Sequence, residues 1–421
     1  MGQPGRVPGR AWVVTGAGVA VNLCLGILYA WSVWKGALLA PAGVSPGDPM
    51  TGANAGWAYL SDSQANVAFS LCGFLFAVVM IPGGKLQDRY GPRAGATLAG
   101  LCLGGGCVLA GLMQSYLGLI LGFGVLGGVG MGLGYAAATP AAVRWFGPHR
   151  RGLIVGLVVG GYGGAAAYIA PLATELIKGG GLTTSFVALG TMFGSVIVVA
   201  AQFLKMPPAG YVPPGPPAST AVKPATADVP AAGVLRTWQY YALVGLFVGS
   251  AQAGLLVIGN AVPIMNSTAK AYALFAANAW LLAAFGGVVN ASGRVGTGSY
   301  SDRVGRVNAF GLNGLAAAAC LFALPAVIAD KNVWLLFVLV GVVYWQYGGT
   351  LALMPAWTAD FYGSKNLGLN YGLVFLGWGI AFFVPQLAAG IKDATGSMDG
   401  AFYLSGGLLV AAVAGSRFVR K

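Results

Sequence analysis

Long apolar runs separated by short polar segments dominate this chain. A helix of about 17 to 25 mostly apolar residues can cross a hydrocarbon core roughly 30 Å thick, and twelve runs are long enough. They lie near residues 12–34, 65–83, 94–113, 116–142, 153–176, 183–204, 238–264, 273–298, 307–329, 333–357, 368–390 and 400–416. The pattern therefore predicts an all-α membrane protein with twelve transmembrane helices.

Two longer polar stretches interrupt this pattern. Residues 41–62 follow the first run and are expected to form a long loop. Residues 206–236 are rich in Pro, Ala and Gly, a composition that cannot pack a core and is typical of a flexible linker. The linker divides the chain into an amino-terminal six-helix bundle (1–205) and a carboxy-terminal six-helix bundle (237–421).

The basic residues predict the orientation of these helices. With Arg294 set aside, seventeen Lys and Arg residues fall on the side of the linker and both termini, and five fall on the other side. Because cytoplasmic loops carry an excess of Lys and Arg, both termini are predicted to be cytoplasmic. The net charge of +13 is then a topology signal with attraction to membrane lipid, and no nucleic-acid partner is required.

The composition also argues against an enzyme. Only 8% of residues are charged, against about a quarter in a soluble domain. The chain has one histidine, no Walker loop and no clustered metal ligands, so no cofactor, metal or catalytic group is expected. The cysteines lie in apolar runs without metal-like pairing, which favours small core residues. We expect a monomer.

The two halves repeat a loop motif. Residues 84–93 read GKLQDRYGPR and residues 298–306 read GSYSDRVGR, and a Pro-then-aromatic-Gly landmark recurs at Pro140 and Pro355. The offsets are 214 residues for the aspartates of the loops and 215 for the prolines. Two landmarks at one spacing predict a parallel repeat of two bundles. The charged residues of the loops are candidates for a conformational latch between neighbouring helices: Asp88, Arg89, Arg93, Asp302, Arg303 and Arg306.

Arg294 is the most deeply placed charge in the sequence. It precedes Asp302, the first charge at the aqueous boundary, by eight residues, which is about 12 Å of helix and close to the bilayer midplane. A cation at that depth costs several kcal/mol unless it faces water or a partner. Because a guanidinium offers two parallel donors to a carboxylate, Arg294 is predicted to bind an acidic substrate.

Further candidates surround this arginine. Asn290 lies one turn earlier on the same helix face, and Tyr135 and Tyr347 lie near the same depth and could donate hydroxyl bonds. Ordinary helix packing stays open as the alternative. The predicted apolar walls, which would exclude water and strengthen the arginine–carboxylate contact, are Tyr29, Leu351, Phe375 and Trp378.

Lys35 and Glu175 lie at the outer ends of the first and fifth runs. Either could take part in proton coupling or in admitting the substrate. The alternatives are an interfacial lysine whose ammonium extends to water, and a surface acid beside a loop.

The loop motifs, the twelve runs and the central linker together resemble the major facilitator superfamily. Within it, the chain is similar to the oxalate/formate antiporter family, which also holds bacterial relatives of the monocarboxylate transporters. The likeness rests on Asn260-Ala-Val-Pro263, Asn290-Ala-Ser-Gly-Arg294, the segment from Tyr347 to Pro355, Tyr362-Gly363, Asn370-Tyr371-Gly372, Tyr135 and Arg144-Trp145-Phe146. It implies the major facilitator fold, a multi-pass location in the inner cell membrane and a substrate-binding arginine in the eighth span.

Two departures from the family refine the substrate. Oxalate carriers have a lysine in the eleventh span for the second carboxylate, and the matching residue here is Trp378. One buried cation can neutralise one carboxylate, so small monocarboxylates such as lactate or pyruvate are favoured. Animal monocarboxylate transporters have an aspartate one turn before the arginine, where this chain has Asn290, so a coupled proton must be carried by another group or by the substrate.

The predicted function is secondary transport of small monocarboxylates by alternating access around Arg294, with proton symport preferred over exchange. Two alternatives stay open: an oxalate/formate-type exchanger that uses Lys35 as its second cation, and a sensor that binds an acid without transporting it.

Overall fold

The computed structural model describes residues 7–208, 210–213, 228–363 and 366–419, whose regular elements are helices apart from two isolated β-bridges. The helices of the first part are α1 (Gly9–Leu25), α2 (Trp31–Leu38), α3 (Asp62–Tyr90), α4 (Pro92–Met113), α5 (Tyr116–Gly118), α6 (Gly128–Val143), α7 (Pro148–Gly164) and α8 (Ala166–Phe203). Those of the second part are α9 (Ala231–Val234), α10 (Trp238–Thr268), α11 (Ala273–Ala277), α12 (Leu281–Val304), α13 (Arg306–Ala329), α14 (Val333–Tyr362), α15 (Leu367–Ala381), α16 (Phe383–Thr395) and α17 (Asp399–Ser416). Short 3₁₀ turns occupy Gly26–Ala30, Gly52–Asn54 and Ala269–Ala271, and Leu119–Gly127 is π-helical.

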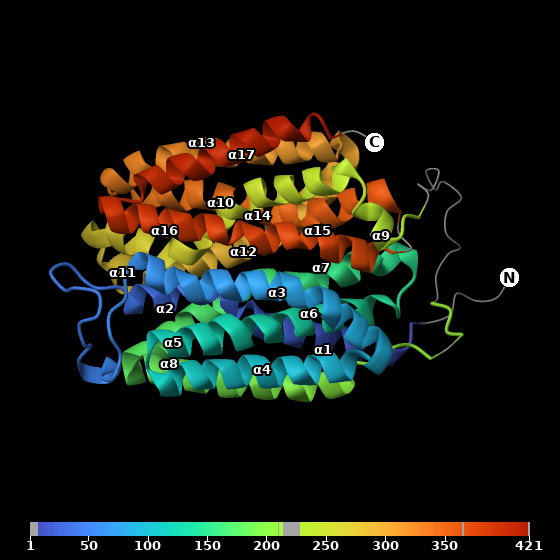
Figure 1. Cartoon of the computed structure of the whole chain (residues 1–421), viewed down its shortest axis with the longest axis horizontal. Coiled ribbons are helices and arrows are strands. Elements are labelled where there is room, and N and C mark those ends of the chain that lie inside the picture. Colours follow the sequence, from blue (N-terminus) through green and yellow to red (C-terminus); the bar gives the residue numbers. More distant parts are fainter. Residues whose placement is uncertain (1–6, 209, 214–227, 364–365, 420–421) are drawn as a thin grey trace.

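The helices form two groups (Figure 1). The first helix group (α1 to α8) fills one half of the molecule and the second helix group (α10 to α17) fills the other, with both chain ends at the same end of the long axis. Part of the predicted linker, residues 209 and 214–227, lies outside the described residues. Its described flanks pack on the helices, since the Tyr211 hydroxyl donates to the Trp145 carbonyl at 3.1 Å and the Val229 amide donates to the Tyr362 carbonyl at 3.1 Å. The proposed domain boundaries stay predictions.

The long apolar helices of the structure agree with most of the predicted membrane spans. In the described chain, ten segments are long and apolar enough to cross a membrane. One of them, residues 152–203, covers two predicted spans and bends at Gly181. The predicted span near 273–298 is instead the short α11 followed by α12, because the helix breaks between residues 278 and 280. Because α12 contains polar residues, it is not among these ten apolar segments. The number of twelve transmembrane helices therefore stays a prediction.

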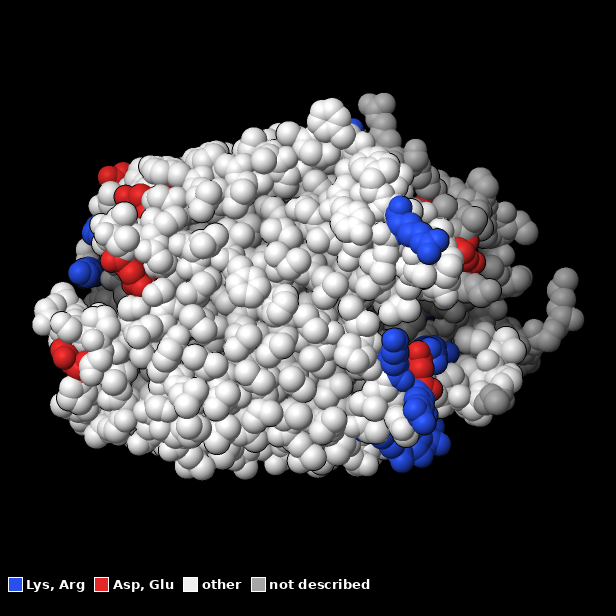
Figure 2. Space-filling model, viewed as in Figure 1, with Lys and Arg blue, Asp and Glu red and all other residues white. Residues whose placement is uncertain are grey.

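Charges are confined to the two ends of the long axis on the face shown in Figure 2. A broad belt without charged residues separates these ends, and Lys and Arg gather mainly at the end where the chain termini lie. A helix satisfies its own backbone hydrogen bonds, which makes it suitable for such an apolar environment.

The repeated loop motifs adopt the same backbone conformation. Gly91 separates α3 from α4 with φ 80°, and Gly305 separates α12 from α13 with φ 87°. Residues with a β-carbon rarely adopt this region of φ, so glycine is required in each turn. The 214-residue sequence repeat is therefore also a repeat of local structure.

Glycine is also required where the loop before α3 contacts α8. Gly181 has φ 78°, and a β-carbon there would lie 2.0 Å from the Ala53 carbonyl oxygen. Beside it, the Leu182 amide donates to Asn54 Oδ1 at 2.8 Å and the Trp57 indole donates to the Thr183 hydroxyl at 2.9 Å. The predicted long loop is thus attached to the bend of residues 152–203.

Candidate functional site

Arg294 lies near the middle of α12 and is 9% exposed. Its Nε donates to Asn290 Oδ1 at 3.4 Å, and its Nη1 donates to the backbone carbonyl of Val159 on α7 at 3.3 Å. Both bonds are long for charged donors. Nη2 is buried and has no hydrogen-bond partner. The guanidinium therefore keeps donors for a ligand.

In the part of the chain that the structure describes, no carboxylate forms an ion pair with this guanidinium. Among the described residues, Asp62 is the only acidic residue that is buried, and it is occupied in a separate cluster of lysines described below. A buried polar group without a partner is costly, and a buried charge is more so. The site is therefore electrostatically suited to an anion.

Several tyrosines lie near the guanidinium. Tyr29, Tyr135, Tyr347 and Tyr371 are all close enough to interact with it electrostatically. The Tyr29 and Tyr347 hydroxyls are 2.8 Å apart, and the Trp378 indole N–H donates to the Tyr347 hydroxyl at 2.8 Å. An indole nitrogen is only a donor, so Tyr347 accepts from Trp378. Trp378 thus has a polar role beyond that of the predicted apolar wall.

Aromatic rings from both helix groups close the space around these hydroxyls. Phe76 and Tyr162, from the first helix group, lie with ring centroids 5.8 Å apart, and Phe76 lies 5.1 Å from Trp378 of the second group. Phe375 stacks on Trp378 at 4.7 Å, and Tyr135 lies 5.7 Å from Tyr162. The Tyr162 hydroxyl is buried without a hydrogen-bond partner, which makes it a further donor for a ligand.

The structure thus brings most of the predicted site residues together. Arg294, Asn290, Tyr29, Tyr135, Tyr347, Phe375 and Trp378 meet in one region, and Leu351 lies half-buried on α14. Sequence reasoning missed Phe76 and Tyr162. Tyr162 had a usable signal, since it is the single large side chain in the run Gly160-Gly-Tyr-Gly-Gly164.

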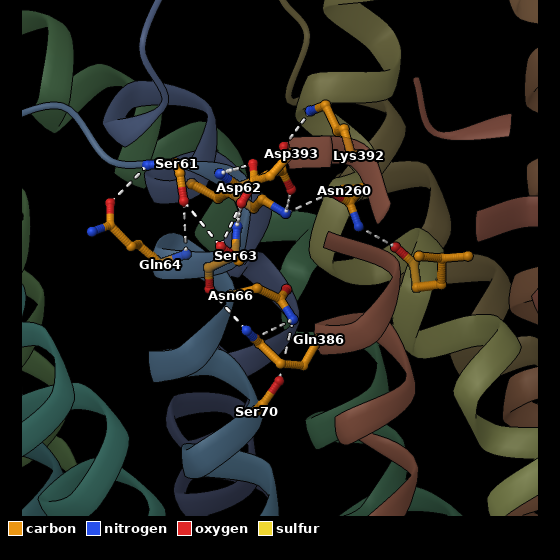
Figure 3. A network of polar contacts seen from close by, with 12 residues as sticks. Ser61, Asp62, Ser63, Gln64, Asn66, Ser70, Asn260, Gln386, Lys392 and Asp393 are labelled. Carbon is orange, nitrogen blue, oxygen red and sulfur yellow. Dashed lines mark hydrogen bonds and ion pairs between the residues drawn. The ribbon is translucent and has the colours of Figure 1, made fainter. Parts of the chain in front are cut away.

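A second polar cluster lies at the start of α3 and joins the two helix groups (Figure 3). The carboxylate of Asp62 is held between the ammonium groups of Lys35 on α2 and Lys392 on α16. Lys35 also donates to Asn260 Oδ1 on α10 at 2.7 Å. Asp393 Oδ1 and Oδ2 accept the backbone N–H groups of Asp62 and Ser63 at 2.9 Å each. We call these five side chains, Lys35, Asp62, Asn260, Lys392 and Asp393, the ion-pair cluster.

The ion-pair cluster completes the amino terminus of α3. Ser61 accepts from the amide of Gln64, and the Gln64 side chain accepts from the amide of Ser61, in a capping box. The two amides that this box leaves bare are those that Asp393 binds. A carboxylate is stabilised there by the bare N–H groups and the helix dipole.

Polar contacts continue from the cluster along the boundary between α3 and α16. Asn66 donates to Gln386 Oε1 at 3.2 Å, and Gln386 donates to the Ser63 carbonyl at 3.1 Å. Ser70 donates to the carbonyl of Phe382, the residue before α16, at 2.8 Å. Figure 3 shows Asn66, Gln386 and Ser70 below Asp62. The two helix groups are therefore held together at this end.

Lys35 and Glu175 occupy different environments. The side chain of Lys35 is fully buried in the ion-pair cluster, so it does not extend to water. Glu175 is 68% exposed and pairs with Lys178 at 3.0 Å. The structure therefore brings Lys35, and not Glu175, into a buried ionic network.

The predicted latch residues lie among exposed contacts at the ends of neighbouring helices. Asp88 pairs with Arg144 at 3.4 Å, and Arg306 pairs with Asp302 at 2.6 Å and with Asp360 at 3.5 Å. Arg89 lies over the ring of Tyr90, while Arg93 and Arg303 are exposed. Each ion pair joins elements of one helix group, and its effect on conformation stays a prediction.

Replacing Asp62 should strongly destabilise the protein. In Asp62→Asn the ammonium groups of Lys35 and Lys392 lose the carboxylate that they share, and leaving the buried charge of Lys35 without it costs about 3–5 kcal/mol. The control Glu175→Gln breaks an exposed pair and should cost about 0–1 kcal/mol. Thermal unfolding of the purified variants measures both. Equal melting temperatures for the two variants would contradict the importance of the ion-pair cluster.

Comparisons with known proteins agree with this architecture. The sequence profile of the Major Facilitator Superfamily matches residues 49–350. The chain is 29% identical to the MFS-type transporter YhjX of Escherichia coli (strain K12) over 377 residues, covering 90% of this chain and 87% of that protein. It is 26% identical to the oxalate:formate antiporter of Oxalobacter formigenes, covering 88% and 82%, and 26% identical to monocarboxylate transporter 12 of Xenopus laevis, covering 77% and 73%.

The fold has a solved counterpart. A bacterial homolog of the human lysosomal transporter Spinster, in an inward-facing and occupied conformation, superposes with a TM-score of 0.67 at 16% identity, covering 99% of this chain and 97% of that one. The helical architecture and the profile match lead to one conclusion: the chain belongs to the major facilitator superfamily, and it is a multi-pass membrane transporter rather than an enzyme.

Proposed function

We propose that this protein transports small monocarboxylates, such as lactate or pyruvate, by alternating access around Arg294. The observation that carries the proposal is a buried guanidinium with an unbonded Nη2 and, within residues 7–208, 210–213, 228–363 and 366–419, no carboxylate paired with it. The unbonded Tyr162 hydroxyl offers a second donor nearby. A carboxylate supplies both the negative charge and the acceptor oxygens that these groups lack.

The chemistry of the site supports one carboxylate over two. Trp378 occupies the position of the second cation of oxalate carriers, and its N–H is engaged with Tyr347. Lys35, the remaining candidate for a second cation, is already paired with Asp62. A dicarboxylate would therefore leave one carboxylate desolvated without a counter-charge. This weighs against the oxalate/formate-type exchanger, although an oxalate:formate antiporter is among the relatives.

We further propose twelve transmembrane helices with both termini in the cytoplasm. The support is the kinked 52-residue segment 152–203, which is long enough for two crossings, together with α12 and the other nine apolar segments. The basic residues gathered at the end of the termini favour the cytoplasmic side for that end. The ion-pair cluster is then at the outer face.

In this orientation the ion-pair cluster acts as an outer gate. Polar contacts between α3 and α16 at the outer end keep the helix groups together there, which corresponds to a carrier closed to the outside. Opening requires Lys392 and Asp393 to leave Asp62 and Ser63. Alternating access is a rocking motion of the two groups around the central arginine.

Proton symport is the coupling we propose. Asn290 cannot carry the proton, so the substrate or another group does. The empty carrier must return with Arg294 charged, and the bonds to Val159 and Asn290 supply part of the compensation that this step needs. Anion exchange avoids the empty return and is the competing mechanism.

Arg294 should be essential for acid binding. Pyruvate, L-lactate, acetate, formate and oxalate are added to purified protein, and thermal stabilisation is measured. Pyruvate or lactate should give the largest shift, and Arg294→Gln and Arg294→Lys should lose it while still folding, since a lysine cannot form the bidentate pair. Arg303→Gln, which removes an exposed arginine from the same helix, is the control.

A stabilising acid whose effect survives in Arg294→Gln would overturn the assignment of the site. Binding of an acid without flux in proteoliposomes would favour the sensor.

The outer gate should weaken when its helix cap is removed. In Asp393→Asn the α3 terminus loses a charged acceptor of two amides, worth about 1–2 kcal/mol, so the open population should rise about 5- to 30-fold. The reporter is Ala77→Cys, whose side chain lies between α3 and α15, in a background lacking native cysteines. Its labelling by an impermeant maleimide from outside should accelerate. Asp399→Asn, an exposed acid at the start of α17, should leave labelling unchanged; equal rates for the two would refute the gate.

Symport and exchange differ in what they require inside a vesicle. In proteoliposomes without any internal organic anion, symport predicts that added pyruvate or lactate enters and acidifies the lumen. A pH-sensitive dye in the lumen provides the measurement. Uptake that needs an internal anion and leaves the lumen pH unchanged would establish exchange instead.

A further inference from the structure

The guanidinium of Arg294 is held by a helix from the opposite helix group. Nη1 donates to the Val159 carbonyl, and Nε donates to Asn290, whose Nδ2 in turn donates to the Gly163 carbonyl at 3.4 Å. Val159 and Gly163 are four residues apart on α7, and Asn290 and Arg294 are four residues apart on α12. Residues at this spacing lie on one helix face, so the four form a closed ladder between the two helices.

Gly163 also determines where the guanidinium can lie. A β-carbon at this position would be 3.0 Å from Arg294 Nε, 3.2 Å from Cζ and 3.4 Å from Nη2. The guanidinium therefore rests directly against the α7 backbone, and a side chain at residue 163 would require it to move. The Gly163 carbonyl is in the last turn of α7, where carbonyls lack a partner within the helix, so it is available to Asn290.

These contacts leave a specific part of the guanidinium for a ligand. Nε and Nη1 are used by the ladder, while Nη2 stays buried and unbonded. The Asn290 oxygen accepts from Arg294 and its nitrogen donates to the Gly163 carbonyl, so Asn290 connects the arginine to α7.

We propose that Gly163 is a positioning residue for Arg294: the α7 backbone around it, together with Asn290, aims the guanidinium at the substrate carboxylate. This inference rests on the proposed function, and it adds a residue of the first helix group to a site whose cation comes from the second. A methyl group at residue 163 would displace the guanidinium by a few tenths of an ångström and change the direction of its donors.

The test compares adjacent glycines. Gly163→Ala places a methyl group on the guanidinium, whereas in Gly164→Ala the β-carbon meets only the Ala291 side chain at 3.8 Å. Both exchanges favour a helix, so both proteins should fold. For pyruvate, Gly163→Ala should raise the dissociation constant and the KM of uptake about tenfold, the value of roughly one charged hydrogen bond, with kcat little changed. Gly164→Ala should stay within about twofold of wild type.

The outcomes separate this inference from the proposed function. If Arg294→Gln abolishes pyruvate binding but Gly163→Ala and Gly164→Ala have equal dissociation constants, the positioning role is refuted and the function stands. If wild type binds none of the acids, or Arg294→Gln binds as well as wild type, the proposed function itself fails.

A second variant tests the same inference if the Gly163→Ala protein cannot be purified. Asn290→Leu removes the bridge between Gly163 and Arg294 and should raise the KM for pyruvate by a similar factor, while Ser292→Ala, which alters an exposed side chain bonded only to its own helix, should not. An unchanged KM in Asn290→Leu would also refute the ladder.

Discussion

The incomplete compensation of one buried positive charge is the constraint on which this structure depends. Arg294 has two long hydrogen bonds and tyrosines nearby, but it has no carboxylate partner among the residues whose structure is described. A cation in an apolar region with so little compensation is unfavourable unless a ligand completes it. Aromatic rings from both helix groups surround the site, and they reduce the screening by water that would otherwise weaken the attraction to an anion.

The ion-pair cluster solves the same physical problem in the opposite way. Asp62 is as deeply buried as Arg294, but its carboxylate pairs with two ammonium groups. Asn260 accepts a further hydrogen bond from Lys35, and Asp393 accepts the backbone N–H of Asp62. Nothing in this cluster calls for a ligand. A buried charge whose partners are all within the protein suits a contact that joins the two helix groups. A buried charge with too few partners suits a binding site.

Much of this could be predicted from local sequence patterns. The helix positions follow from apolar length, and the depth of Arg294 follows from its distance to Asp302 along one helix. The repeated loops share a turn because Gly91 and Gly305 occupy equivalent places in similar motifs. Each of these features depends on residues close together in the chain, which is the information that a single sequence contains. Tyr135 and Tyr347 follow from the same estimate of depth.

Features that depend on contacts between distant helices were not predictable in this way. Asp62 pairs with a lysine 330 residues away, and as the last residue of a polar loop it resembles an ordinary surface acid. Lys35 looks like an interfacial lysine until Asp62 is placed beside it. Asn290 was expected to face the substrate, and only the position of α7 reveals that both of its polar atoms have partners.

The adjacency of Lys392 and Asp393 makes the outer contact sensitive to rotation of α16. Consecutive residues on a helix are about 100° apart, so only one rotational setting brings the ammonium to Asp62 and the carboxylate to the bare amides of α3 together. Turning α16 by a single residue would bring the positive side chain to the positive end of the α3 dipole, where it is repelled. Lys392 and Asp393 together therefore fix the rotation of α16 relative to α3. An insertion or deletion within α16 would disrupt their contacts with α3, in the other helix group.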